Sequence, residues 1–457
     1  MKIIKIEVKK LFGVFNHEIP LNTKDHITII HGPNGYGKTI LLTLVNAIFD
    51  SQYSIIASIP FSELLIYFDN KSKLCLKKGI SSEKDDGKKE KNGEQLLIEL
   101  SNSRSKQKVY IPKMDMGLQD LPFPPEILEE IISGLERVSQ KTWLYLPTHE
   151  KLSINQVLDR FGHMLPFSKI KKIAGPAWLR NIINSININF IDTQRLLNVS
   201  HSTNDSIIRE SIIRIRRSPI PVMTPAVITY SEELAKAIQT KLAEYGSLSQ
   251  ALDRTFPTRL VKGKRSDHHT IDKLKIELNA LEEKRSRLIA AGFLEKGKEI
   301  DFKDLQKIDE SNINVLSVYI KDVKQKLSVF DELTEKIDLL IKIINIRFLH
   351  KKLSINKTDG FVFKTSEGKI IPPTSLSSGE QHELVLLYEM LFKVKPNSLI
   401  LIDEPEISLH VAWQQEFLKD LQEITRLVGF DVLIATHSPQ IINDRWDLTV
   451  ELKGPKQ

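Results

Sequence analysis

The chain has a single cysteine, Cys75, among its 457 residues. One thiol cannot form an intramolecular disulfide or a multi-cysteine zinc site, so the composition favours a reducing compartment. No apolar run approaches the roughly 20 residues that span a bilayer, and the opening segment MKIIKIEVKK lacks the apolar stretch of a signal peptide. We therefore expect a cytoplasmic protein without a membrane partner.

Glycine and proline contribute only 20 residues each, which excludes a collagen-like chain. The shares of hydrophobic residues, 41%, and charged residues, 27%, exclude a wholly disordered one. At roughly 100 to 200 residues per domain, the length allows two to four domains, or one domain with large insertions. The 65 Lys and Arg exceed the 58 Asp and Glu by +7, an excess that permits nucleic-acid binding without arguing strongly for it.

The first part of the chain alternates between strand and helix patterns. Residues 1–30 predict three strands, of which the last, around Ile29, is buried. A glycine-rich turn and an apolar helical stretch, residues 40–49, follow directly. Residues 64–76 again predict strands, whereas residues 119–185 are mixed and mostly helical in pattern.

Residues 228–348 change to long helical periodicity. Apolar residues step by three or four positions from Ile271 to Leu281, with Leu288 seven positions further on, and again by three or four from Leu316 to Ile344. These two stripes predict an antiparallel coiled-coil arm, and an ordinary helical domain with amphipathic helices stays the alternative. Because strand and helix patterns return afterwards, we expect an α/β core interrupted by a helical insertion. The expected division is residues 1–200 for the N-terminal part of the core, 201–352 for the helical coiled-coil insertion and 353–457 for the C-terminal part of the core.

The first chemical motif is a glycine-rich loop between a predicted buried strand and a predicted helix, the context that the pattern G-x-x-x-x-G-K-[ST] requires. Its residues are Gly32, Pro33, Asn34, Gly35, Tyr36, Gly37, Lys38 and Thr39. The glycines let backbone N–H groups surround phosphates, Lys38 reaches the β- and γ-phosphate oxygens, and the Thr39 hydroxyl can bind Mg²⁺. The motif predicts an ATP site, with a plain glycine-rich turn as the alternative.

Polar residues follow two further apolar strands. Asp403 and Glu404 end the run LILIDE, where buried charge is costly unless it faces a metal or ligand. Asp403 is the candidate Mg²⁺ ligand and Glu404 the candidate base that polarises the attacking water. His437 follows the run VLIAT and is placed to contact the γ-phosphate or that water. A solvent-facing strand end and a structural histidine are the alternatives.

A fourth motif, Leu-Ser-Ser-Gly-Glu at residues 376–380, precedes an apolar helix. Ser377, Ser378 and Gly379 would present backbone N–H groups at the positive end of the helix dipole, which favours an anion. Ser377 with Glu380 three positions later is also the pattern of a capping box, so a plain helix cap stays open.

Taken together, and in their order along the chain, the four motifs resemble the ABC-type P-loop ATPase fold shared by structural-maintenance-of-chromosomes proteins, the coiled-coil ATPases of double-strand-break repair and RecF-like proteins. The resemblance implies ATP and Mg²⁺ as cofactors. It also implies that the LSSGE-like residues complete the nucleotide site of the opposite subunit, so the active unit would be a homo-oligomer of at least two chains. Near the end of the predicted strand 186–191 the family places a glutamine that senses Mg²⁺ and the γ-phosphate, a role that falls here on Gln194.

More narrowly, the runs SLSSGEQHELVLLYEML, LILIDEPEISLHVAWQ and VLIATHSPQII look like the ATPases of the overcoming-lysogenisation-defect group. Within it the chain is most similar to stand-alone ATPase subunits of phage-defence modules such as PARIS, with Septu another candidate. The resemblance covers residues 1–70, 185–200 and 355–445. Fused members continue into a Toprim nuclease, whereas this chain ends 20 residues after His437. The implied effector is therefore a separate protein, a Toprim or HNH nuclease, with DNA or a phage protein as the trigger.

The leading expectation is an ATP-hydrolysing switch in bacterial anti-phage defence that controls such an effector. The alternative is a RecF-like DNA repair or chromosome-maintenance ATPase that clamps DNA. A transporter subunit fits poorly, since more than 300 residues separate the phosphate loop from LSSGE. Two basic clusters on or beside the insertion could contact a phosphate backbone or an acidic partner, although a solvated helix face is the usual explanation. They comprise Arg209, Arg214, Arg216 and Arg217, and Arg259, Lys262, Lys264 and Arg265.

Overall fold

The computed structural model divides the chain into two compact units. The first contains Met1–Arg195, Val199–Met223 and Val394–Gln457, and the second Leu196–Asn198 and Thr224–Lys393. The residues that the structure describes are 1–80, 94–102, 105–112, 125–132, 134–139, 142–161, 175–191, 197–198, 224–262, 271–295, 313–407 and 409–455. The boundaries expected for the insertion, residues 201 and 352, stay a prediction.

A parallel sheet of five strands, in the order β11-β17-β18-β3-β19, forms the centre of the first unit. The strands are β3 (Ile27–His31), β11 (Ile188–Ile191), β17 (Leu399–Asp403), β18 (Asp431–Ala435) and β19 (Thr449–Glu451). The three middle strands consist almost wholly of buried apolar residues, as expected for parallel strands covered on both faces. In register, Asp403 lies beside Ala435 and Ala435 beside Ile30, so the loops after these strands leave the sheet at one edge.

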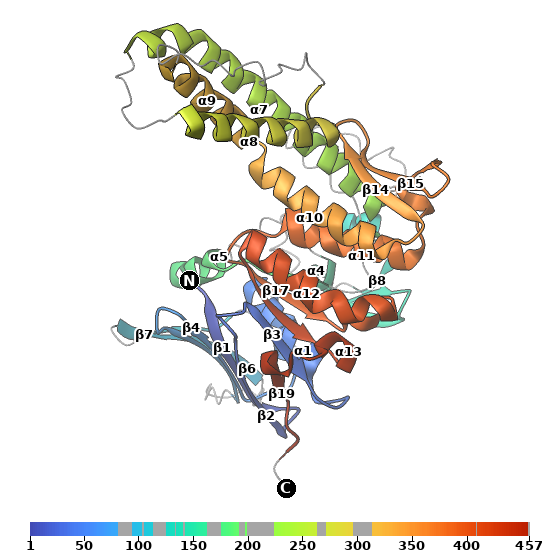
Figure 1. The fold of residues 1–457 in the computed structure, drawn as a ribbon. Helices are drawn as coiled ribbons and strands as arrows, with labels where there is room; N and C mark the ends of the chain where they lie inside the picture. Colours follow the sequence, from blue (N-terminus) through green and yellow to red (C-terminus); the bar gives the residue numbers. More distant parts are fainter. Residues whose placement is uncertain are drawn as a thin grey trace. The chain divides into compact units, whose positions relative to one another are not determined.

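Helix α1 (Lys38–Phe49) follows β3 and packs on β11, β17 and β18 (Figure 1). Its apolar side chains Leu41, Leu42 and Val45 are buried in a core that also takes Leu401 and Leu433 from the sheet. The other helices of this unit are α2 (Tyr53–Ser58), α3 (Glu126–Ile131), α4 (Ile154–Phe161), α5 (Ala177–Ser185), α12 (Val411–Val428) and α13 (Pro439–Ile442).

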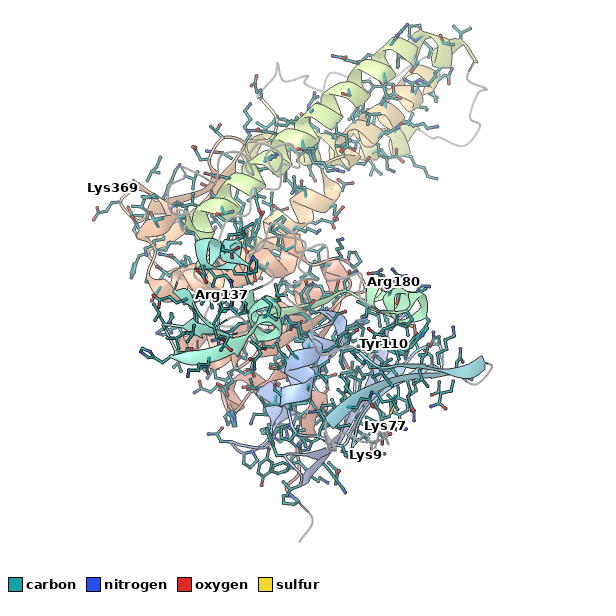
Figure 2. The ribbon with its side chains drawn as sticks, turned by 180° about the vertical axis from the view of Figure 1, so that it is seen from behind. Lys9, Lys77, Tyr110, Arg137, Arg180 and Lys369 are labelled. Carbon is teal, nitrogen blue, oxygen red and sulfur yellow. The ribbon has the colours of Figure 1, made fainter. Side chains whose placement is uncertain are left out.

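An antiparallel sheet of six strands shares this core, in the order β2-β1-β4-β5-β6-β7. Its strands are β1 (Ile3–Leu11), β2 (Phe15–Pro20), β4 (Glu63–Phe68), β5 (Lys73–Ile80), β6 (Glu94–Asn102) and β7 (Ser105–Tyr110). These bounds, with those of β3, confirm the strands expected in residues 1–30 and 64–76. Lys9 donates to Glu63 at 2.6 Å, and Lys77 is the cross-strand neighbour of Glu63. Figure 2 shows Lys9 and Lys77 on this sheet.

Residues 119–185 contain a small sheet that the sequence pattern did not predict. Strands β8 (Leu135–Ser139), β9 (Thr142–Tyr145) and β10 (Glu150–Ser153) form it in the order β10-β9-β8. Fully buried Trp143 lies in the core that they share with α3 and α4. Strands of four or five residues give too few positions for a period of two to stand out from the helical patterns on either side.

The second unit combines long helices with short strands. The helices are α7 (Ala226–Lys262), α8 (Ile271–Ala290), α9 (Ile313–Ser328), α10 (Asp331–Arg347) and α11 (Ser378–Tyr388). The strands are β12 (Leu197–Asn198), β13 (Thr224–Pro225), β14 (Lys351–Asn356), β15 (Gly360–Thr365) and β16 (Ile370–Ile371). None of the helices within the described ranges is both long and apolar enough to cross a membrane.

The stripe from Leu316 to Ile344 belongs to two helices rather than one continuous helix. Helix α9 ends at Ser328 and α10 begins at Asp331, with Phe330 as its N-cap. The fully buried Phe330 ring packs against Tyr245 at a centroid distance of 5.4 Å and against Phe293 at 6.0 Å. The apolar spacing continues across the break between α9 and α10 because Phe330, which lies in that break, is a core residue.

The expected antiparallel pairing of the two stripes is wrong. Lys284, late in α8, pairs with Asp331 directly after α9, whereas Leu274 and Leu278, early in α8, cluster with Ile320. Contacts that advance together along both helices mean that α8 and α9 run in the same direction.

The antiparallel partner of α9 is α7. Asp253 pairs with Lys326, and Arg259, six positions later in α7, pairs with Asp322, four positions earlier in α9. An apolar stripe identifies a buried face but not the direction of the helix that covers it. For this reason the sequence pattern found that α8 and α9 pack together but gave them the wrong relative direction. The coiled-coil character of the insertion stays a prediction.

Candidate functional site

The phosphate loop, residues 32–39, joins β3 to α1 in the first unit. Gly35 and Gly37 both have a φ of +85°, a conformation that side chains with a Cβ rarely adopt. A Cβ on Gly37 would also lie 2.6 Å from Leu11 Cδ2. Two of the motif glycines are therefore required by the backbone itself, which curls the loop before α1.

Lys38 extends its ammonium group back into this loop. Its Nζ donates to the carbonyl oxygens of Gly32 at 2.8 Å and Pro33 at 3.1 Å, and only 5% of the residue is exposed. Burial lowers the pKa of Lys38, while the carboxylates of Glu404, Asp403 and Glu406 oppose that shift. A cation desolvated in this way is stabilised by any further anion that approaches, such as a phosphate.

The end of β17 brings oxygen atoms to the loop. The Thr39 hydroxyl donates to Asp403 Oδ1 at 3.2 Å. A hydroxyl and a carboxylate are ligands suited to Mg²⁺, which usually takes one or two carboxylates and completes its shell with water and substrate phosphates. The donor set therefore fits Mg²⁺, although no group of three His, Cys, Asp or Glu that could hold a metal occurs among the described residues.

Glu404 and His437 face each other across the same edge. Glu404 has a φ of +44°, and its N–H donates to the Ala435 carbonyl at 2.8 Å. A left-handed conformation in a residue with a side chain costs roughly 1–2 kcal/mol, so the surrounding contacts hold it in place. His437 Nε2 lies 3.7 Å from Glu404 Oε1, and His437 Nδ1 lies 3.3 Å from Lys38 Nζ.

The structure thus brings together five predicted site residues from three loops of the sheet: Lys38, Thr39, Asp403, Glu404 and His437. Of the remaining loop residues, Pro33, Asn34 and Gly35 are exposed. The Tyr36 carbonyl lies 2.9 Å from His17 Nε2, a contact from β2 that the sequence did not indicate.

The LSSGE residues belong to the second unit. Ser377 is the N-cap of α11, and the expected capping box is present. The Glu380 N–H donates to Ser377 Oγ at 3.4 Å, and the Ser377 N–H donates to Glu380 Oε2 at 2.7 Å. Ser377 and Ser378 are exposed, and Gly379 is partly exposed.

Some predicted residues cannot be placed. Gln194 lies outside the described residues, and β11 ends just before it with Ile191 beside Ile402. Of the two basic clusters, only the side chain of Arg259 is described, and it pairs with the buried Asp322. An ion pair inside the helical unit accounts for this arginine without a ligand.

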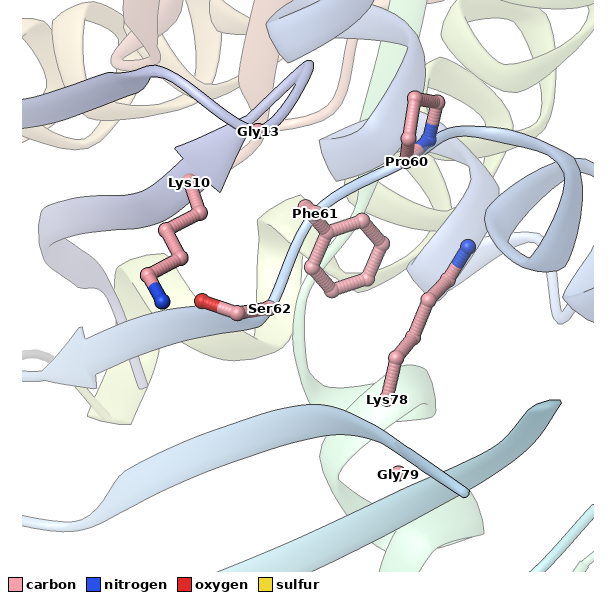
Figure 3. A pocket seen from close by; sticks show the side chains of 7 residues that line it. All are labelled: Lys10, Gly13, Pro60, Phe61, Ser62, Lys78 and Gly79. Atoms are coloured by element: carbon pink, nitrogen blue, oxygen red, sulfur yellow. The ribbon is translucent and has the colours of Figure 1, made fainter.

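A further cavity of about 280 Å³ lies at the ends of β1 and β5 in the first unit (Figure 3). It is lined by Lys10, Gly13, Pro60, Phe61, Ser62, Lys78 and Gly79. The Lys78 ammonium donates to the Ala57 and Ile59 carbonyls and lies over the Phe61 ring. Polar contacts within the protein therefore already engage this lysine.

Known proteins share sequence or structural similarity with this chain. A curated Escherichia coli protein, Retron Ec83 probable ATPase, is 25% identical over 193 residues. That match covers 40% of this chain and 34% of the relative, so the chain spans about a third of that protein's length. The Smc head domain of Pyrococcus furiosus is 14% identical with a TM-score of 0.35, covering 99% of this chain and 94% of that one. The SMC head domain of Thermotoga maritima is 10% identical with a TM-score of 0.30, covering 97% and 91%.

The family assignment rests on a longer match. Residues 1–442, nearly the whole chain, match the AAA ATPase domain family AAA_15. Together with the phosphate loop at the edge of a parallel sheet and the long helices of the second unit, this match confirms the expected α/β P-loop ATPase core with a helical insertion. The chain therefore belongs to the AAA ATPase domain family AAA_15.

Proposed function

We propose that the chain binds ATP with Mg²⁺ at the edge of the parallel sheet and hydrolyses it there. The observation that supports this most directly is the hydrogen bond from Thr39 to Asp403, at 3.2 Å. It joins the phosphate loop to the acidic end of β17, so two oxygen ligands lie beside the position where the motif receives β- and γ-phosphates. Thr39 and Asp403 would hold Mg²⁺, which when bound neutralises charge on those phosphates.

Each remaining group has a role that follows from its position. The Lys38 ammonium would leave the loop carbonyls to contact the β- and γ-phosphate oxygens. Glu404 would accept the proton of the attacking water, because it is the carboxylate next to Asp403 and a general base must lie within reach of its proton. His437, between Lys38 and Glu404, would donate to the γ-phosphate or orient the water. Gln194 stays a candidate sensor of Mg²⁺ and the γ-phosphate.

The LSSGE residues extend the proposal to a second chain. The exposed N-terminus of α11, with Ser377, Ser378 and Gly379, would contact the γ-phosphate bound by the partner subunit. Two ATP molecules would then lie between two chains, and hydrolysis would release the pair.

We place this ATPase in bacterial anti-phage defence, as a switch of the PARIS or Septu type that controls a separate nuclease effector of the Toprim or HNH class. The similarity to a protein named as a retron ATPase supports defence over DNA repair, although it covers 40% of the chain. DNA or a phage protein would be the trigger. The expected cytoplasmic location stays a prediction.

Turnover of the Glu404→Gln protein tests the site. We expect ATP binding to be retained and hydrolysis to slow at least about 10²-fold, the usual scale for loss of a general base. Glu416→Gln, on the exposed surface of α12, is the matched control and is expected to match wild type. Hydrolysis at the wild-type rate in Glu404→Gln would remove that residue from its role.

Native purification tests the biological role. We expect a nuclease to copurify with the chain, and the assembly to become toxic when triggered during infection. Sensitivity of a deletion strain to DNA damage, without any loss of phage resistance, would favour the RecF-like repair function instead.

A further inference from the structure

One carboxylate, that of Glu406, ties the loop after β17 to the loop after β18. Its Oε1 accepts a hydrogen bond from Thr436 Oγ1 at 2.8 Å and another from the His437 N–H at 2.8 Å. Thr436 is fully buried, and its hydroxyl also accepts the Ser438 N–H at 2.9 Å. A single oxygen atom therefore fixes the backbone at the point where His437 leaves the sheet.

Glu406 is itself held from the other side. Gln414 of α12 donates through Nε2 to the Glu406 carbonyl at 3.1 Å and to the Leu409 carbonyl at 3.2 Å. The Gln414 Oε1 accepts a hydrogen bond from Ser438 Oγ at 3.0 Å. These bonds close a ring through the turn after Glu404, the start of α12 and the residues after β18, so a shift of one part displaces the others.

The second carboxylate oxygen of Glu406 takes no part in these hydrogen bonds. Glu406 Oε2 is buried, and none of the described protein groups donates a hydrogen bond to it. The hydrogen bonds from Thr436 and His437 thus need a single acceptor oxygen at the right distance from the backbone, and they do not need the second carboxylate oxygen. This separates the geometric contribution of the side chain from its charge.

We propose that Glu406 is the positioning residue for His437. It sets the distances from the imidazole to the Glu404 carboxylate and the Lys38 ammonium, 3.7 Å and 3.3 Å in this structure. The inference rests on the proposed function, in which His437 contacts the γ-phosphate or the attacking water. A displacement of about 1 Å at such a group lowers a rate by about 10²-fold.

Two substitutions distinguish length from charge. Glu406→Gln keeps the side-chain length and an acceptor oxygen, whereas Glu406→Asp keeps the charge but is one methylene shorter. We expect kcat of Glu406→Gln to stay within about threefold of wild type, and kcat of Glu406→Asp to fall about 10- to 100-fold with KM within about twofold. The reverse ranking, an equal loss in both variants or no loss in either overturns the proposal.

A double-mutant cycle shows whether Glu406 acts through His437. In a His437→Ala background, Glu406→Asp is expected to lower kcat by less than about twofold further. If kcat of the double variant falls by the product of the two single-variant losses, the proposal is overturned. Thr436→Val, which removes one of the two donors to Glu406, is expected to lose part of the same rate and provides an independent test if Glu406→Asp does not fold.

The controls separate this inference from the proposed function. Glu416→Asp, on the same helix as Gln414 but exposed, is expected to leave kcat and the dissociation constant for ATP unchanged. If Glu404→Gln hydrolyses ATP at the wild-type rate, the proposed site fails whatever Glu406 does. If Glu404→Gln is slow while every Glu406 variant matches wild type, only the positioning role is wrong.

Discussion

His437 Nδ1 lies 3.3 Å from Lys38 Nζ, although 399 positions separate the two residues in the chain. Lys38 is buried, and its pKa is lowered mainly by that burial. No protein carboxylate pairs directly with its ammonium among the described contacts, which instead go to two carbonyl oxygens and the imidazole. The ammonium therefore has charge left to neutralise when a phosphate arrives.

Lys38→Ala is expected to abolish nucleotide-dependent function. No other cation of the motif can neutralise the β- and γ-phosphate charge, and losing a charged hydrogen bond of up to about 3 kcal/mol weakens binding about 100-fold. Equilibrium binding of a fluorescent ATP analogue and steady-state turnover measure the effect. Lys24→Ala, in an exposed turn, is the matched control. Unchanged affinity in Lys38→Ala would contradict an ATP site in this loop.

The helical unit is expected to unfold separately from the nucleotide site. Leu327 and Phe330 are almost fully buried, and replacing both with glutamine removes packing worth about 2–5 kcal/mol for Leu327 and about 3–5 kcal/mol for Phe330. Helical circular dichroism and protease resistance of the second unit should fall, while the affinity for ATP stays within about threefold. Lys321→Gln with Lys324→Gln, on the exposed side of α9, is the control. Loss of nucleotide binding as well would make the insertion part of the main core.

A mixture of two inactive variants tests the shared site. Ser377→Arg places bulk and charge at the N-terminus of α11, which should leave one-sided ATP binding but block hydrolysis. Mixed with Lys38→Ala chains, it should restore part of the turnover, because a mixed dimer contains one site with neither defect and one with both.

Two controls accompany this mixture. Each variant must be folded alone by circular dichroism, and the two must associate in a pull-down with different tags. If they associate and the mixture stays as inactive as its parents, the sharing of sites between chains is wrong and the LSSGE segment is only the helix cap that its capping box already makes.

Cys75 is expected to be unreactive in the native protein. Its buried thiol donates to Glu63 Oε1 at 3.2 Å, and burial, followed by that hydrogen bond, raises the pKa from 9.0 to about 12. At pH 8 we expect the native thiol to react with a disulfide reagent at least about 10²-fold more slowly than in urea. Comparable rates in both states would contradict the buried position.

The raised pKa of Cys75 also makes the stability of the protein depend on pH. Because the folded pKa lies above the unfolded value, the contribution of this thiol to folding is complete below about pH 9 and is lost as the pH rises toward about 12. Cys75→Ala should therefore show a smaller loss of stability than wild type between these two pH values, measured by urea unfolding. An identical pH dependence in both proteins would contradict the raised pKa.

The sequence by itself determined those parts of the protein in which neighbouring residues along the chain form the functional group. The phosphate loop is one example, since Gly35 and Gly37 adopt conformations that glycine alone adopts readily, directly before Lys38. Asp403, Glu404 and His437 could be assigned to one site because each follows a buried apolar strand, and parallel strands end at the same edge of a sheet. Helical periodicity was enough to predict a helical insertion within that core.

Tertiary structure alone decided the relationships between distant segments. The hydrogen bonds from Thr436 and His437 to Glu406 join residues about 30 positions apart, and in sequence Glu406 is only another acid after Glu404. The direction of α9 against α7 likewise depends on Lys326 meeting Asp253 and Arg259 meeting Asp322. An apolar stripe records that a helix face is buried, because burial is a property of each residue. It does not record the covering partner, because that choice belongs to the fold as a whole.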